Sequence, residues 1–172
     1  MTDTESTREY TYKVFDSTVD ALLKVRDSLV LPNLEAAVAA ICAAGRVEFY
    51  GFGASAAVAF DAQHKFFRLQ ITSAAYSDPH LQNMSATSLN AGDVVIAISQ
   101  SGRSQALLDS MDLVKQAGGL VIGLAPSGSP VALRASIPIE LNAKDDIQIY
   151  TPLSSRISPL AVIDVFAIWI SQ

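Results

Sequence analysis

Two serine-bearing segments contain the residues best suited to chemistry in this chain. The longer segment reads Ser99-Gln100-Ser101-Gly102-Arg103-Ser104 and directly follows the apolar run at residues 94–98. Apolar residues then recur at roughly helical spacing, so we expect a helix to begin around residues 103–105. Hydroxyls and backbone N–H groups at a helix N-terminus bind anions, most often a phosphate. This segment therefore predicts a site for a phosphorylated small molecule.

The shorter segment has the same form and lies upstream. It reads Gly51-Phe52-Gly53-Ala54-Ser55 and separates a short apolar strand from an expected helix. Its glycines permit a tight turn and a close approach to a ligand, and Ser55 offers a hydroxyl near the helix start. A Gly-x-Gly loop alone serves equally well as a plain turn. Two strand–loop–helix units with serines at both helix starts favour a binding site.

The elements that must position these loops alternate along the chain. Five strands are expected, at residues 47–50, 71–76, 94–98, 120–124 and 137–141. Helices are expected between them, at residues 54–69, 79–89, 104–117 and 130–134. This alternation predicts an α/β fold, a three-layer α-β-α sandwich with a five-stranded parallel sheet. Ligands of such sheets bind outside the carboxyl ends of the strands.

The N-terminal part of the chain differs in composition. We expect residues 1–12 to be a flexible lead, residues 13–45 to be helices packed on the domain, and residues 46–172 to form the ligand-binding domain. The two helices should cover residues 15–29 and 34–44, with Asn33 as the N-cap of the second. Cys42 is expected as a small core residue of that helix.

Composition limits the classes of protein to consider. The 172 residues are 50% hydrophobic and 17% charged, which fits one folded domain. The net charge of −5 argues against direct grip on a nucleic-acid backbone. A single cysteine excludes an intrachain disulfide and fits a cytoplasmic setting. The strongest apolar run, residues 160–170, is too short to span a bilayer, so no membrane partner is expected.

The two serine segments resemble the paired signature of sugar isomerase (SIS) domains, over about residues 46–170. Three further segments are similar to the effector domains of RpiR-type transcriptional regulators, in particular the hexose-catabolism repressors: residues 60–65, 76–80 and 154–157. The resemblance implies a phosphosugar-binding effector domain of a bacterial regulator of carbohydrate metabolism, and not an enzyme. It implies neither a metal nor a cofactor.

The resemblance also implies which residues bind the ligand. The loop positions that bind the phosphate or hydroxyls of the sugar in SIS domains match Ser55, Ser99, Gln100, Ser101 and Ser104, with Gly53, Ala54 and Gly102 around them. Additional candidate contacts are Arg103, Arg156, His80 and Lys65. Repressors of this group respond to 2-keto-3-deoxy-6-phosphogluconate. Nothing in the residues themselves selects that ligand from other sugar phosphates.

DNA binding is expected to lie outside this chain. RpiR-type regulators carry an N-terminal helix-turn-helix domain, and the residues before Tyr12 are too few for one. The resemblance therefore implies an effector domain whose DNA contacts belong to a missing part.

Two other functions compete with the sensor. A phosphosugar isomerase needs a general base beside the sugar carbons, yet no glutamate falls in an expected carboxyl-end loop, which leaves Asp78 and His80 as the best candidates. A dinucleotide-binding module would fit Gly51-x-Gly53-x-x-Ala56, a loose Rossmann fingerprint, but gives the second serine loop no role. We rank the sensor first and the isomerase second.

The C-terminal segment predicts self-association. Residues 159–170 are apolar around nearly the whole helical circumference, which is typical of a helix buried on more than one side. We expect a homodimer or higher oligomer with this helix at the interface, joined by the helix at residues 15–29. Phe166 and Trp169 are the expected contact residues.

Overall fold

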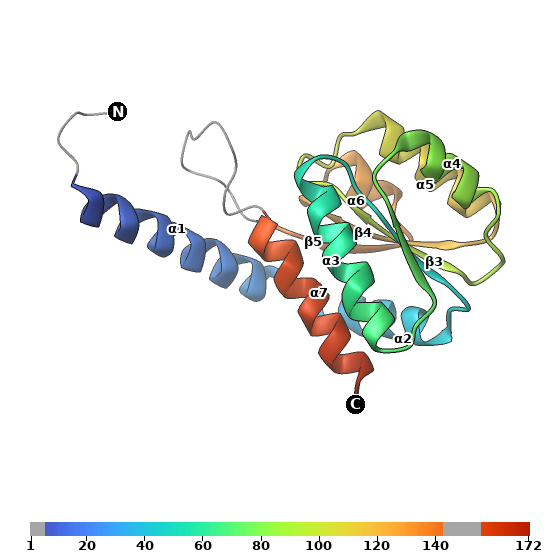
Figure 1. Cartoon of the computed structure of the whole chain (residues 1–172), viewed down its shortest axis with the longest axis horizontal. Helices are drawn as coiled ribbons and strands as arrows, with labels where there is room; N and C mark the ends of the chain where they lie inside the picture. The colour runs from blue at the N-terminus through green and yellow to red at the C-terminus, as the bar shows by residue number, and fades with distance from the viewer. Residues whose placement is uncertain (1–5, 143–155) are drawn as a thin grey trace.

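A five-stranded parallel sheet forms the centre of the computed structural model, which describes residues 6–142 and 156–172 (Figure 1). The strand order is β2-β1-β3-β4-β5, and every neighbouring pair is parallel. The strands are β1 (Val47–Tyr50), β2 (Ser73–Tyr76), β3 (Val94–Ile98), β4 (Leu120–Ala125) and β5 (Ile137–Glu140). All five expected strands are present, with small shifts at their ends. The α/β prediction is confirmed.

Helices cover both faces of the sheet and complete three layers. The helices are α1 (Thr7–Ser28), α2 (Leu31–Ala43), α3 (Ala54–Arg68), α4 (Pro79–Ala86), α5 (Gln105–Gln116), α6 (Pro130–Arg134) and α7 (Ile157–Ile170). One core joins α2, α3 and α7 to the face that carries Phe49 and Ile96, and the other joins α5 and α6 to the face that carries Val95. Because both faces are covered, β3 is apolar at every position.

The first helix begins earlier than expected, at Thr7. The cause is a capping box: the Glu9 backbone N–H donates to Ser6 Oγ (3.4 Å), and the Ser6 N–H donates to the Glu9 carboxylate (2.6 Å). The prediction of a flexible lead through residue 12 is therefore wrong from Thr7 onward, and residues 1–5 lie outside the described part. Figure 1 shows α1 extending away from the sheet.

The second helix also departs from expectation. It begins at Leu31 with Val30 as N-cap, because Pro32 fits the first helical turn. Asn33 is therefore not the cap, and its side chain instead donates to the Pro138 carbonyl of β5 (2.9 Å). Cys42 is exposed and not in the core, since α2 buries the opposite face, at Leu34, Ala37, Val38 and Ile41.

A buried carboxylate lies inside the sheet, on the side of α4. Glu48 of β1 is fully buried and accepts hydrogen bonds from Tyr50 Oη (2.7 Å) and Ser85 Oγ (2.7 Å). Arg46 Nε lies 3.2 Å from Glu48 Oε1 and forms an ion pair with the carboxylate. Buried charges are tolerated when they are paired and hydrogen-bonded in this way. Through the bond from Ser85, the network connects α4 to β1, the strand that leads into the first serine loop.

This network predicts a loss of stability in alkali. Burial, and then the charge of Glu48, raise the pKa of Tyr50 far above its usual value. The unfolded chain releases that proton above about pH 10 while the folded chain keeps it, so Tyr50 should remove roughly 1.4 kcal/mol of unfolding free energy per pH unit above that point. Denaturant unfolding of Tyr50→Phe should show a shallower alkaline decline than the unmodified chain. Tyr12→Phe, at an exposed tyrosine, should leave the decline unchanged.

Candidate functional site

Both serine loops lie at the carboxyl edge of the sheet, side by side. The first leaves β1 and enters α3, and the second leaves β3 and enters α5. These strands are neighbours, with Tyr50 paired to Ala97 near their ends. The chain passes from β1 to β2 on one side and later to β3 on the other, which is the topological switch point where α/β sheets bind ligands. The expected convergence of the loops is confirmed.

The first loop depends on its glycines. Gly53 is the N-cap of α3 with φ 55° and ψ −123°, a conformation that side chains rarely adopt. A Cβ on Gly51 would lie 2.7 Å from the backbone oxygen of Ser55. The loop therefore turns sharply enough to bring the first turn of α3, with no side-chain cap, to the edge of the sheet.

The second loop is held by its own hydroxyls. Ser99 Oγ accepts a hydrogen bond from the Gly102 N–H (2.9 Å), and Ser101 Oγ accepts one from the Arg103 N–H (3.2 Å). Gly102 has φ 64°, and a Cβ there would collide with Ser129. Ser104 is the N-cap of α5 but makes no side-chain cap bond. A hydroxyl that accepts in this way still has its own proton to donate to a ligand.

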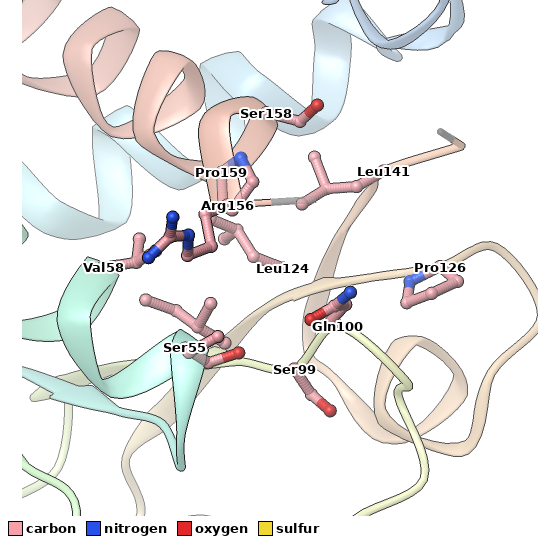
Figure 2. A pocket seen from close by; sticks show the side chains of 12 residues that line it. Ser55, Val58, Ser99, Gln100, Leu124, Pro126, Leu141, Arg156, Ser158 and Pro159 are labelled. Atoms are coloured by element: carbon pink, nitrogen blue, oxygen red, sulfur yellow. The ribbon is translucent and has the colours of Figure 1, made fainter. Parts of the chain in front are cut away.

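Two cavities open between these loops. The serine cavity, about 380 Å³, is lined by Phe52, Ala54, Ser55, Ile98, Ser99, Gln100, Ser101, Ser104 and Leu107. The α7 cavity, about 140 Å³, is lined by Ala54, Ser55, Val58, Ile98, Ser99, Gln100, Leu124, Pro126, Leu141, Arg156, Ser158 and Pro159 (Figure 2). Because five of these residues line both cavities, one ligand can occupy both.

Most of the expected site residues meet here. Ala54, Ser55, Ser99 and Gln100 line both cavities, Ser101 and Ser104 line the serine cavity, and Arg156 lines the α7 cavity. Gly53 and Gly102 shape the loops without lining either cavity.

Three candidate contacts lie elsewhere. Arg103 is exposed and lines neither cavity. His80 is exposed in the first turn of α4 and lines neither cavity. Lys65 pairs with Asp61 of its own helix (2.7 Å) and with Asp164 of α7 (2.5 Å). Since no ligand is present, a contact between any of the three and the ligand stays a prediction.

Ser158 is the main residue that the sequence did not indicate. Its side chain is 1% exposed, its hydroxyl has no hydrogen-bond partner, and it lines the α7 cavity. Its position, two residues after Arg156 at the start of an expected helix, was the available signal. Ser154 and Ser155 of the same resembling segment lie outside the described residues.

The chemistry of the lining is that of anion binding. Among the described lining residues, Arg156 is the single charged side chain, and none is an aspartate, glutamate or histidine. Asp78 instead caps α4, where it accepts from the Leu81 N–H (2.9 Å). No group of three metal-ligating side chains occurs among the described residues, and no helix there is long and apolar enough to cross a membrane.

Curated proteins similar to this chain include regulators. The sequence profile of the SIS domain matches residues 40–169. The HTH-type transcriptional regulator HexR of Escherichia coli K12 is 38% identical over 97% of this chain, which spans 58% of that protein. The bifunctional protein glk of Paraburkholderia xenovorans is also 38% identical over 97% of this chain, which spans 26% of it. The chain therefore spans little more than half of the one relative and about a quarter of the other.

Solved structures share the fold. The NanR protein of Vibrio vulnificus, complexed with ManNAc-6P, has a TM-score of 0.87 at 22% identity, and the match covers 95% of this chain and 62% of that one. The sugar isomerase domain of an RpiR transcription factor from Sphaerobacter thermophilus has a TM-score of 0.84 at 23% identity, with 94% and 89% of the two chains covered. At these identities the likeness establishes the fold alone.

Proposed function

This chain belongs to the SIS domain family, and from that premise we propose that it is the phosphosugar-binding effector domain of an RpiR-type transcriptional regulator of carbohydrate metabolism. The observation that supports this most directly is the pair of serine loops, each opening a helix, that line one cavity at the edge of the sheet. HexR, a relative by sequence, is a transcriptional regulator. DNA binding would belong to the part of such proteins that this chain does not span. The setting we propose is the cytoplasm.

The phosphate would occupy the serine cavity. The first turns of α3 and α5 both begin there, and neither has a side-chain cap, so both helix dipoles favour an anion. In α3 the N–H groups of Ser55 and Ala56 already donate to the carbonyls of Phe52 and Gly53, so α5 would supply most of the N–H groups that bind the phosphate. Ser55, Ser99 and Ser101 would donate hydroxyl protons to the phosphate oxygens. The carbon chain of the sugar would extend toward the α7 cavity. The effector we favour is 2-keto-3-deoxy-6-phosphogluconate.

A panel of ligands tests this function. Thermal unfolding would be followed with 2-keto-3-deoxy-6-phosphogluconate, glucose 6-phosphate, unphosphorylated glucose and inorganic phosphate. A ligand at a hundred times its Kd should add about 2.7 kcal/mol of apparent stability. We expect phosphorylated sugars to stabilise the chain and glucose to have no effect. If no phosphorylated compound raises the melting temperature, the proposed function is wrong.

We further propose that the domain binds phosphosugars without isomerising them. Isomerisation requires a general base beside the sugar carbons, and the described lining offers none. NMR in D₂O with a bound aldose phosphate should therefore show no deuterium uptake at C1 or C2. Uptake that disappears in His80→Ala or Asp78→Asn would establish the alternative function, a phosphosugar isomerase.

Self-association is also proposed. Ile168 and Trp169 of α7 and Phe67 of α3 are exposed, and α7 packs against α3, so large apolar side chains gather on one side of the domain. Contiguous apolar surface of that kind is uncommon on soluble monomers, and two-fold dimers are its commonest solution. Phe166, in contrast, is fully buried in the core of its own chain, so its expected role as an interface residue is wrong.

A further inference from the structure

The α7 cavity contains a charged side chain that the phosphate site does not need. We infer that this cavity is a carboxylate subsite, in which Arg156 and the first turn of α7 bind a carboxylate at the end of the ligand opposite its phosphate. The inference rests on the proposed function, since it takes the phosphate to be bound in the serine cavity. Arg156 and the first turn of α7 would then make the domain bind sugar acid phosphates more tightly than neutral sugar phosphates.

Arg156 is available for a ligand. No described residue makes a hydrogen bond or ion pair with its guanidinium. Figure 2 shows this group beside Val58, on the side of the cavity that leads to Ser55. A guanidinium without a carboxylate partner on the wall of a cavity attracts an anion, and its planar fork matches a carboxylate in two parallel hydrogen bonds.

The start of α7 supplies a second, independent observation. The helix runs for 14 residues and has no side-chain cap, so its first N–H groups favour a negative charge. In that first turn, the Ser158 hydroxyl is buried at 1% exposure without a hydrogen-bond partner. Buried hydroxyls are normally hydrogen-bonded. Figure 2 shows this hydroxyl directed away from Ser55, Ser99 and Gln100, so the carboxylate is assigned to Arg156 and the N–H groups of this turn, and not to Ser158.

The rest of the α7 cavity argues for a compact anion and against a further stretch of sugar hydroxyls. Its walls include Val58, Leu124 and Leu141, which offer no side-chain partners to hydroxyls. Its volume, about 140 Å³, is well below the 380 Å³ of the serine cavity. Since Ser55 and Ser99 line both cavities, a short phosphorylated chain can present its phosphate to one and its carboxylate to the other.

Two open-chain probes that differ only at C1 test this subsite by calorimetry. They are 6-phosphogluconate, which has a carboxylate there, and sorbitol 6-phosphate, which has a hydroxymethyl group. We expect the unmodified chain to bind 6-phosphogluconate about ten- to a hundredfold more tightly. Arg156→Gln should abolish this preference and leave the affinity for sorbitol 6-phosphate unchanged. Ser158→Ala should preserve the preference, because the Ser158 hydroxyl is directed away from the other lining side chains.

The controls separate failure of the subsite from failure of the phosphate site. Arg103→Gln removes a cationic side chain that lines neither cavity and should preserve the preference. Equal affinity of the unmodified chain for both probes would overturn the carboxylate subsite and leave the proposed function standing. An equal loss for both probes in Arg156→Gln would likewise overturn it, because Arg156 would then bind the phosphate. If neither probe binds although another phosphorylated sugar raises the melting temperature, the subsite is wrong and the proposed function stands; if no phosphorylated compound binds, both proposals are wrong.

Discussion

Replacing Ser99 by alanine is expected to weaken phosphosugar binding about ten- to a hundredfold, the equivalent of roughly 1.5–3 kcal/mol. Ser99 lines both cavities, and its hydroxyl also accepts the hydrogen bond from the Gly102 N–H that closes the loop. The variant therefore removes a ligand contact and loosens the loop that carries Ser101. Ser101→Ala removes only an exposed hydroxyl and its bond to the Arg103 N–H, so its loss should fall at the lower end of the range.

Calorimetry with a phosphorylated sugar that stabilises the unmodified chain measures this loss. Ser127→Ala is the matched control, because Ser127 is an exposed serine in the next loop at the same edge of the sheet and lines neither cavity. Its affinity should equal that of the unmodified chain. Denaturant unfolding should show similar stability for Ser101→Ala and Ser127→Ala, and a lower stability, by about 1–3 kcal/mol, for Ser99→Ala, whose buried Gly102 N–H loses its acceptor. Unchanged affinity in both Ser99→Ala and Ser101→Ala would remove this loop from the phosphate site.

The strands and the serine loops could be predicted because their signals are local. A continuous apolar run at residues 94–98, followed by hydroxyls and then helical spacing, already specifies strand, loop and helix. The order of such units places their loops at one edge of a parallel sheet. The capping box of Ser6 and Glu9 was a local signal of the same quality. Reading it would have placed the start of α1 correctly.

The α7 cavity could not be predicted, because it forms only when α7 docks beside α3. Leu141, Arg156 and Ser158 reach the edge of the sheet from segments far from the serine loops in sequence. The ion pair between Lys65 and Asp164 depends on the same docking, so the local sequence around Lys65 does not indicate it. Periodicity gave no help, since α7 is apolar on nearly every side and its buried and exposed faces look alike in sequence.

That ambiguity decides how the interface must be tested. Within α7, Phe166 is fully buried, whereas Ile168 is 64% exposed. Phe166→Ala should therefore lower the unfolding free energy of the monomer by about 3–5 kcal/mol. Because this side chain is buried within its own chain, the variant does not test association. Ile168→Glu places a charge on the outward face and should leave the unfolding free energy of the monomer within about 0.5 kcal/mol. The two variants separate folding from assembly.

We expect the unmodified chain to be a dimer by light scattering at tens of micromolar, and Ile168→Glu to be a monomer. A charge opposed to the apolar side chains of a second copy would be buried without a partner, which a dimer interface does not tolerate. Leu133→Glu is the matched control: Leu133 is 78% exposed on α6, on the opposite face of the sheet, and its replacement should preserve the dimer. If the unmodified chain is monomeric, or if Leu133→Glu dissociates it as readily as Ile168→Glu, then the α3 and α7 surface is not the interface. Since α1 also packs on α7, loss of the dimer in Ile168→Glu and not in Leu133→Glu would place the interface beside α1.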